Sequence, residues 1–176
     1  MNHATTTVRP GRLDDLPALT AVYNHYVETS NATFDVRAFT VDERLAWFDT
    51  YAEHGPHRLL VAELDGALLG YATSSPLRAK PAYDTSVETT IYLHPDARGR
   101  GIGQHLYGSL LEVLRGQDLH RAYAGIALPN HASVRLHQAL GYEPIGTYHE
   151  VGRKFGRYWD VQWFERALPL GDGAGR

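Results

Sequence analysis

Three glycines at alternate positions, Gly99, Gly101 and Gly103, lie between a strand-like run and an amphipathic run of residues. The first turn of a helix carries amide hydrogens that have no partner inside the helix, so a loop that permits close approach can bind phosphate oxygens there. Glycine removes the side chains that would block this approach. A flexible turn is the alternative interpretation, but three glycines in this position lower the stability of the helix that they precede. The spacing therefore favours a phosphate-binding loop.

Two common phosphate-binding loops do not match this spacing. A Walker A loop needs a lysine and then a serine or threonine after its last glycine, whereas Gln104 follows Gly103. A dinucleotide-binding loop needs the spacing GxGxxG in an early β-α-β unit, but the glycines here are spaced GxGxG and follow a predicted hairpin.

A glutamate in the strand-like run before the loop could act as a base. Residues 85–93 are rich in β-branched side chains and are predicted to form a strand. Because side chains alternate along a strand, Glu88 shares one face with Thr90 and Tyr92. Burial would raise the pKa of Glu88 toward the working pH, which suits a general base. A solvated or ion-paired glutamate is the other interpretation.

A second set of polar residues follows the loop. Helical spacing places Asn130, Ser133 and His137 on one side of a predicted helix. Histidine can donate a proton near neutral pH, so His137 is a candidate general acid. The alternative is a packed helix histidine that bonds to a backbone carbonyl.

The elements that must position these groups follow from turn and periodicity signals. Strands are predicted at residues 6–9, 58–64, 67–74, 85–93 and 121–128, and in a final long hairpin over residues 143–168. Helices are predicted to begin near residues 14, 40, 102 and 130. This order predicts an α+β fold with a largely antiparallel sheet.

Local signals mark several boundaries of these elements. Asp65 and Gly66 suit a tight type I′ hairpin turn. Thr40 and Glu43 form a T-x-x-E capping box, so the second helix is expected to begin there and to end at Gly55.

Size, composition and charge exclude several classes of protein. With 176 residues, the chain is predicted to form one domain over residues 1–168, followed by a flexible tail over residues 169–176. The net charge of −3 comes without basic blocks, so no nucleic-acid partner is expected. No apolar run or signal peptide is recognisable, so no membrane partner and a cytoplasmic location are expected. Cysteine is absent and the histidines lack a metal-binding pair, so no metal is expected.

The glycine loop resembles the acetyl-coenzyme A loop of the GNAT acyltransferases. The pattern of Arg or Gln, two residues, Gly, one residue, then Gly or Ala is matched by Arg98, Gly101 and Gly103. The chain to about Leu168 is similar to the phosphinothricin and methionine sulfoximine acetyltransferase branch. The matching segments are YNHYVETS at 23–30, AYD at 82–84, VETTIYLHPDARGRGIG at 87–103 and LPNHASVRLHQALGYE at 128–143.

This resemblance implies the GNAT fold, with a mixed, mostly antiparallel seven-stranded sheet flanked by four helices. It also implies acetyl-CoA as cosubstrate, Glu88 as the base and His137 as the acid, where many GNAT enzymes carry a tyrosine. The residues expected to bind the cofactor are Ile91, Tyr92, Leu93, Arg98, Gly99, Arg100, Gly101, Ile102, Gly103, Gln104, Asn130 and Ser133.

The acceptor is expected to bind near the loop SPLRAKPAYD at residues 75–84. The two cations of this loop, Arg78 and Lys80, could bind a carboxylate or a phosphinate. Charged loop residues can also be merely solvated. Where the relatives often have arginine, Lys80 supplies a point charge instead of a fork. The residues expected to bind the acceptor are Phe34, Arg78, Lys80, Tyr83, Thr89 and Thr90.

The expected function is acetylation of the α-amine of a small amino acid or analogue, such as phosphinothricin, methionine sulfoximine or methionine sulfone. One alternative is another amine, namely a polyamine, an aminoglycoside or a protein N-terminus, although a cationic acceptor would prefer an acidic rim. A second alternative is a CoA-binding sensor without catalysis. The segment GRKFGRYWD at 152–160 also resembles the branch and implies a homodimer.

Overall fold

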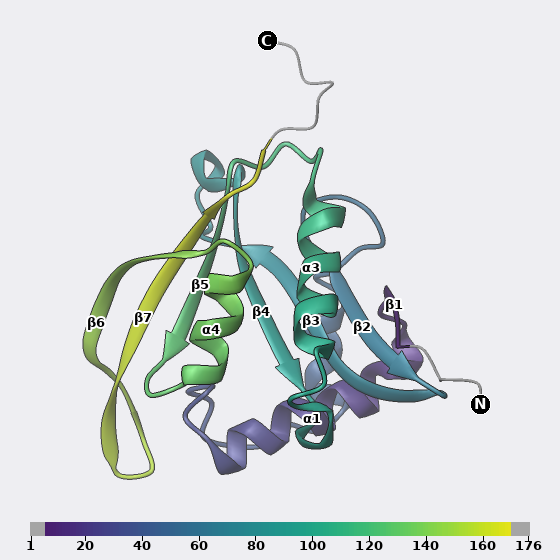
Figure 1. Ribbon diagram of the computed structural model, residues 1–176. Helices are drawn as coiled ribbons and strands as arrows, with labels where there is room; N and C mark the ends of the chain where they lie inside the picture. Colours follow the sequence, from purple (N-terminus) through teal and green to yellow (C-terminus); the bar gives the residue numbers. More distant parts are fainter. Residues whose placement is uncertain (1–5, 170–176) are drawn as a thin grey trace.

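Seven strands form a single sheet in the order β1-β2-β3-β4-β5-β7-β6 (Figure 1). The computed structural model describes residues 6–169. The strands are β1 (Thr7–Pro10), β2 (Leu59–Leu64), β3 (Ala67–Pro76), β4 (Ser86–Leu93), β5 (Arg121–Ala127), β6 (Glu143–Lys154) and β7 (Arg157–Ala167). The β4–β5 pair is parallel, and the other neighbouring pairs are antiparallel. The predicted mixed, mostly antiparallel α+β sheet is confirmed.

The helices cover both faces of this sheet. They are α1 (Leu16–Thr29), α2 (Leu45–Phe48), α3 (Ile102–Leu114) and α4 (His131–Ala139). Alternation along β2 separates the two faces, because Leu60 belongs to the core cluster under α3, whereas Leu59 and Val61 pack with α1. In Figure 1, α3 and α4 lie in front of the sheet and α1 lies behind it.

The two central strands separate soon after they meet. β4 and β5 are paired only from Ser86 with Arg121 to Glu88 with Tyr123. Beyond Glu88, β4 continues to Leu93 and β5 continues to Ala127, and the two strands diverge (Figure 1). The backbone of β4 beyond Glu88 is therefore left without β5 as its neighbour.

The predicted type I′ turn is confirmed. Asp65 and Gly66 have φ angles of 50° and 81°, as a type I′ turn requires between β2 and β3. The final hairpin turns at Phe155 and Gly156 in the same way, with φ angles of 53° and 74°. Gly141, at a φ of 80°, follows α4 as a C-terminal cap.

The second helix is shorter than predicted. The capping box is present, because the Thr40 amide donates to Oε2 of Glu43 at 2.8 Å and the Glu43 amide donates to Oγ1 of Thr40 at 3.2 Å. However, α2 ends at Phe48 instead of near Gly55. The hydroxyl of Thr50 bonds to the carbonyl of Trp47 at 2.7 Å, and such a local bond competes with continuation of the helix.

Two expectations concern the ends of the chain and its surroundings. Of the tail predicted for residues 169–176, residues 170–176 lie outside the described part of the chain. Over residues 6–169, each helix is too short or too polar to cross a bilayer.

Candidate active site

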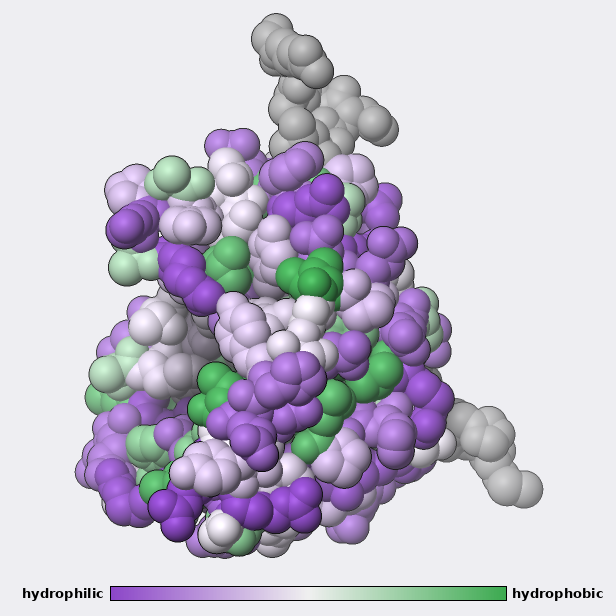
Figure 2. Space-filling model, turned by 90° about the vertical axis from the view of Figure 1, so that its left-hand side faces the viewer, coloured by the Kyte–Doolittle hydropathy of each residue, from purple (hydrophilic) through white to green (hydrophobic). Residues whose placement is uncertain are grey.

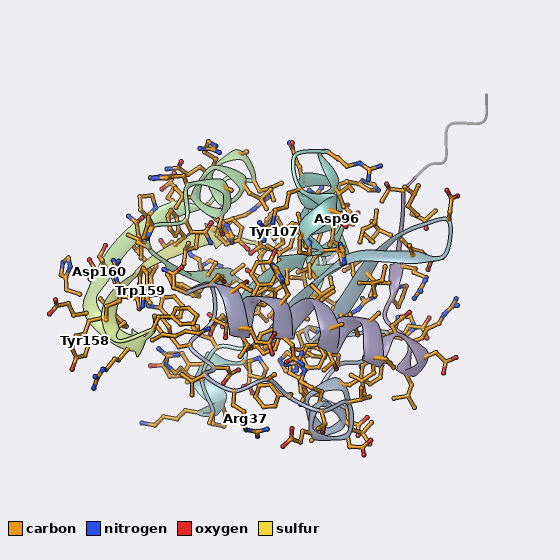
Figure 3. The ribbon with its side chains drawn as sticks, turned by 90° about the horizontal axis from the view of Figure 1, so that it is seen from below. Arg37, Asp96, Tyr107, Tyr158, Trp159 and Asp160 are labelled. Carbon is orange, nitrogen blue, oxygen red and sulfur yellow. The ribbon has the colours of Figure 1, made fainter. Side chains whose placement is uncertain are left out.

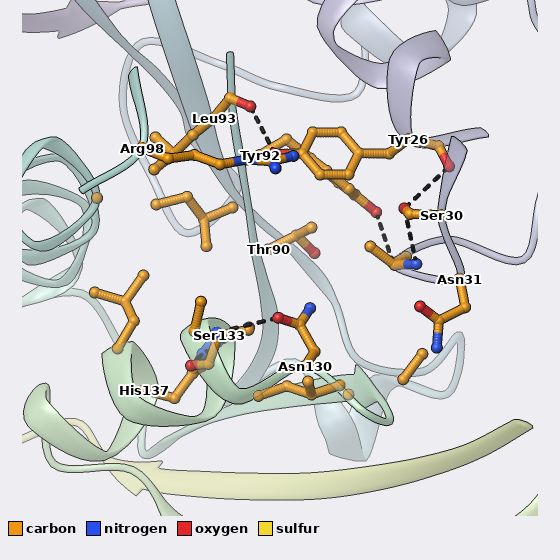
Figure 4. Close-up of a pocket in the computed structure, with 18 of the residues that line it drawn as sticks. Tyr26, Ser30, Asn31, Thr90, Tyr92, Leu93, Arg98, Asn130, Ser133 and His137 are labelled. Atoms are coloured by element: carbon orange, nitrogen blue, oxygen red, sulfur yellow. Dashed lines mark hydrogen bonds between the residues drawn. The ribbon is translucent and has the colours of Figure 1, made fainter. Parts of the chain in front are cut away.

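A cavity of about 590 Å³ opens where β4 and β5 diverge (Figure 4). Its walls come from β4, the end of α1, the glycine loop with the start of α3, the end of β5 and the start of α4. Figure 4 shows Tyr26 and Ser30 on one side of the cavity, and Asn130, Ser133 and His137 on the opposite side.

The glycine loop forms one end of this cavity. Gly99 and Gly101 have φ angles of 74° and 75°, which glycine adopts at little cost. Gly101 is also the N-cap of α3, and no side chain caps that helix terminus. A Cβ atom added at Gly99 or at Gly101 would meet no protein atom within 4 Å. The loop therefore presents the start of a helix to open space, as a phosphate site requires.

The third glycine has a different role. A Cβ atom added at Gly103 would lie 3.2 Å from Cδ1 of Leu93 and 3.4 Å from Cδ2 of Leu136. Gly103 therefore lets the first turn of α3 pack closely against β4 and α4.

Most of the residues expected to bind the cofactor line the cavity. The lining residues from that set are Ile91, Tyr92, Leu93, Arg98, Gly99, Gly101, Gly103, Gln104, Asn130 and Ser133. Asn130 also caps α4, because its Oδ1 atom accepts from the Ser133 amide at 3.2 Å.

The side chains of Arg100 and Ile102, which were expected to bind the cofactor, do not line the cavity. Arg100 is exposed and lies outside the cavity lining, and the side chain of Ile102 is buried in the core beneath α3. The buried Ile102 could contact a cofactor only through its backbone.

Glu88 occupies the last paired position before β4 and β5 diverge. Its side chain is half-buried, and desolvation raises the pKa of the carboxyl above its ordinary value, while the positive charge of Arg78 opposes this rise. The carboxylate therefore lies next to the inner end of the cavity with an increased affinity for a proton.

The two threonines that follow Glu88 have different surroundings. Thr90 lies on the same strand face as Glu88 and lines the cavity. Thr89 has a hydroxyl that lies 3.1 Å from the carbonyl oxygen of Tyr123 and 2.7 Å from the hydroxyl of Tyr142. The expectation that Thr89 binds the acceptor does not fit this geometry, because its hydroxyl is engaged in the interior of the protein.

His137 lies in the cavity wall but is only 3% exposed. Its Nδ1 atom lies 2.8 Å from the carbonyl oxygen of Ser133, and its Nε2 atom lies 3.1 Å from the hydroxyl oxygen of Tyr107. Burial lowers the pKa of the imidazole. The carbonyl bond is that of a packed helix histidine, and the position in the wall is compatible with a role in chemistry.

The residues expected to bind the acceptor lie outside the cavity lining, except for Thr89 and Thr90. Arg78 and Lys80 are exposed on the loop between β3 and β4, and Tyr83 is 45% exposed in its short 3-10 helix (Pro81–Tyr83). Phe34 packs against β6, where a Cβ atom added at Gly152 would lie 2.1 Å from its ring. Arg78 closely follows the end of β3, where Ser75 pairs with Glu88, and its positive charge opposes the rise in the pKa of Glu88.

Sequence reasoning missed the contribution of α1 and the loop that follows it. The Tyr26 hydroxyl donates to the carbonyl of Leu93 at 2.6 Å, and the Asn31 amide group donates to the carbonyl of Leu128 at 3.0 Å. Both residues line the cavity and connect its two sides. Tyr26 lies in the segment YNHYVETS and Asn31 directly follows it, and nothing in the spacing of these residues indicates such long-range contacts.

The fold and the cavity, with an open helix terminus at one end, are those expected of an acyltransferase. A model described as the acetyltransferase (GNAT) family matches residues 19–142. The chain belongs to the acetyltransferase (GNAT) family.

Individual relatives agree with this membership. The chain is 59% identical over 167 residues to a phosphinothricin N-acetyltransferase of Streptomyces coelicolor, covering 94% of this chain and 98% of the relative. It is 35% identical over 164 residues to an L-methionine sulfoximine/L-methionine sulfone acetyltransferase of Pseudomonas aeruginosa, covering 93% of this chain and 95% of the relative. The solved structure of a GNAT superfamily phosphinothricin acetyltransferase from Sinorhizobium meliloti in complex with AcCoA is 33% identical, with a TM-score of 0.88 over 97% of this chain and 92% of that chain. The predicted family, fold and N-acetyltransferase class are confirmed.

Proposed function

We propose that this enzyme transfers the acetyl group of acetyl-CoA to the α-amine of a small amino acid analogue of the phosphinothricin or methionine sulfoximine type. The observation that carries this proposal is the cavity between β4 and β5, which has the glycine loop at one end and Glu88 beside the other. The similarity to phosphinothricin and methionine sulfoximine acetyltransferases supports the acceptor class.

The residues present fit a coenzyme A thioester. The diphosphate would bind at the start of α3, where Gly99 and Gly101 leave open space. The pantetheine arm would lie along Ile91–Leu93, where the backbone of β4 has lost β5 as its neighbour. When bound, the thioester supplies an activated acetyl group, and the protein supplies position and proton transfer.

Glu88 would remove a proton from the acceptor amine, directly or through one water. An amine attacks only when it is neutral, so a base with a raised pKa beside the acyl end of the cavity suits this step. We assign the proton that the departing thiolate needs to His137 in the opposite wall. The Ser133 hydroxyl, 3.3 Å from Nδ1 and part of a residue that lines the cavity, would take this proton and pass its own to the thiolate. Because burial lowers the pKa of His137, its protonated ring is a stronger acid than an exposed imidazolium.

A thiol-release assay tests this function. Acetyl-CoA would be offered with each α-amino acid, methionine sulfoximine, methionine sulfone, phosphinothricin, several polyamines and an aminoglycoside. Thiol release with a small α-amino acid or analogue is expected. Release with polyamines alone would overturn the acceptor class, and binding of acetyl-CoA without release from any amine would indicate a sensor.

Arg78→Ala is expected to raise the KM for the acceptor about tenfold, because a charge-assisted hydrogen bond to the acceptor's anionic group would be lost. The KM for acetyl-CoA should not change, since Arg78 lies outside the cavity lining. Steady-state kinetics at varied acceptor concentration measure both constants. Arg115→Ala is a matched control, because this exposed arginine pairs with Glu112 at the end of α3. Equal acceptor KM values for the two variants would refute the assignment.

We also propose that the enzyme is a homodimer formed through the β6–β7 hairpin. Five large apolar or aromatic side chains on this hairpin are at least half exposed, namely Ile145, Tyr148, Val151, Phe155 and Tyr158. Figure 2 views the molecule from the side on which β6 lies in Figure 1, and Figure 3 shows Tyr158 at the outer end of the hairpin. Exposed apolar surface on a long edge strand is typical of an interface.

Tyr158→Glu is expected to shift the protein toward the monomer, because it places a charge in the proposed interface. Sedimentation velocity over a range of protein concentrations measures the association. Arg37→Glu, on an exposed residue that does not belong to the hairpin (Figure 3), is the control for altered surface charge. A wild-type protein that sediments as a monomer at every concentration would contradict the proposed dimer.

A further inference from the structure

Three buried side chains form a hydrogen-bonded network around His137. The hydroxyl oxygen of Tyr107 lies 3.1 Å from Nε2 of His137, 2.7 Å from Oγ1 of Thr89 and 3.3 Å from the hydroxyl oxygen of Tyr142. Thr89, Tyr107 and Tyr142 are each at most 2% exposed. Figure 3 shows Tyr107 in the interior of the molecule, between the helices and the sheet.

The two ends of this network have fixed hydrogen-bond directions. A carbonyl oxygen can only accept, so Nδ1 of His137 must donate to Ser133, and the hydroxyl of Thr89 can donate to Tyr123. In the neutral ring, Nε2 is therefore the acceptor. The hydroxyl of Tyr107 is the group between these ends whose hydrogen can point either way.

Both protonation states of His137 can be satisfied by rotating that one hydroxyl. With neutral His137, the Tyr107 hydroxyl donates to Nε2. With protonated His137, Nε2 donates to the Tyr107 oxygen, and the Tyr107 hydroxyl donates to Oγ1 of Thr89, which in turn donates to the Tyr123 carbonyl. Neither state leaves an unpaired polar hydrogen beside the ring.

We propose that Tyr107 is a positioning residue for the acetyl transfer, because its hydroxyl gives the Nε2–H of a protonated His137 a hydrogen-bond partner inside the cavity wall. This inference rests on the proposed function. Without the hydroxyl, a protonated ring would hold an unpaired N–H in the interior, which is far more costly than an unpaired acceptor nitrogen.

The surroundings of His137 supply no other polar group for Nε2 among the described residues. From α4, the Ser133 hydroxyl lies 3.3 Å from the other nitrogen, Nδ1. From β7, the apolar ring of Phe164 packs 6.2 Å away, centroid to centroid. Burial raises the pKa of both tyrosines of the network; the charge of Glu88 adds to this rise at Tyr107, and the charge of Arg166 opposes it at Tyr142.

Long-range ¹H–¹⁵N NMR of the histidine rings as a function of pH tests the proposal, with His137→Gln used to assign the signals. In the ligand-free wild type, neutral His137 should carry its proton on Nδ1. In Tyr107→Phe, the midpoint of its titration should fall by about one pH unit, because the charged ring loses its partner. The kcat should fall about tenfold while the KM for acetyl-CoA stays unchanged.

Tyr142→Phe is the matched control. It removes a buried hydroxyl from the same network, but one whose hydrogen-bond partners are Thr89 and Tyr107. It should leave the titration of His137 in place. An unchanged titration in Tyr107→Phe, or an equal shift in both variants, would overturn the proposal. The proposal would also be overturned if neutral His137 in the wild type carried its proton on Nε2. That measurement uses the wild-type protein alone and does not depend on whether a variant folds. The NMR arm does not depend on turnover, so a failed acceptor screen would overturn the proposed function and leave this measurement decisive for Tyr107.

Discussion

Glu88→Gln is expected to lower kcat by about 10²- to 10⁴-fold, the range that a positioned general base contributes. Glutamine keeps the shape of the side chain and its place at the last paired position of β4 and β5. It cannot take a proton from the acceptor amine. The KM for acetyl-CoA should change little, because Glu88 lies beside the cavity and does not line it.

The pH profile gives this prediction a second measurement. Burial raises the pKa of Glu88, and the base must be ionised to act. Wild-type kcat/KM should therefore fall as the pH is lowered through a value above the ordinary pKa of a glutamate. The residual activity of Glu88→Gln should lack this acidic limb. A variant that retained wild-type kcat and the same limb would exclude Glu88 as the base.

Thermal unfolding separates loss of chemistry from loss of fold. Because burial raises the pKa of Glu88, folding disfavours the ionised carboxylate, and this cost is present above the raised pKa and disappears as the pH falls below the ordinary one. Glu88→Gln has no charge to bury. At pH 8 its Tm should therefore equal or exceed that of the wild type, although its kcat is greatly reduced.

Gly101→Val is expected to weaken coenzyme A binding by about 100-fold or more. Two effects combine: a left-handed φ of 75° costs a non-glycine residue about 1–2 kcal/mol, and the new side chain would project into the space proposed for the diphosphate. Isothermal titration calorimetry with desulfo-CoA measures the affinity without turnover. An unchanged Kd would refute the proposed diphosphate site.

Gly116→Val supplies the matched control. Gly116 has a φ of 83° and, like Gly101, would place an added Cβ in open space, but it follows the opposite end of α3. The Gly116→Val variant should lose a similar amount of stability and keep its affinity for desulfo-CoA. Equal loss of affinity in both variants would attribute the effect to backbone strain instead of to the phosphate site.

Local signals in the sequence were sufficient for most of the fold. The type I′ turn at Asp65–Gly66 and the capping box at Thr40 and Glu43 are short-range features, and both are present in the structure. The predicted length of α2 was wrong. The Thr50 hydroxyl competes for a helix carbonyl, and the pattern of apolar residues does not reveal such competition.

The site was only partly predictable for a related reason. Alternation in β4 placed Glu88 and Thr90 on one face, and the structure shows Thr90 in the cavity lining. The partners of Thr89 come from β5, from α3 and from the residue after Gly141, between 18 and 53 positions away in the sequence. No periodicity relates such positions, so the network around His137 emerged only from the folded chain.

The early separation of β4 from β5 has a consequence for how this enzyme can diversify. A ligand that docks there would occupy the place of a missing strand and would be recognised through backbone N–H and C=O groups. Every residue carries both groups except proline, which lacks the N–H. Such a ligand would place no demand of its own on the side chains at 91–93, which are constrained instead by their packing against the core. The proposed acceptor contacts depend on particular side chains, such as that of Arg78, so substitutions there would change the acceptor while the donor stays the same.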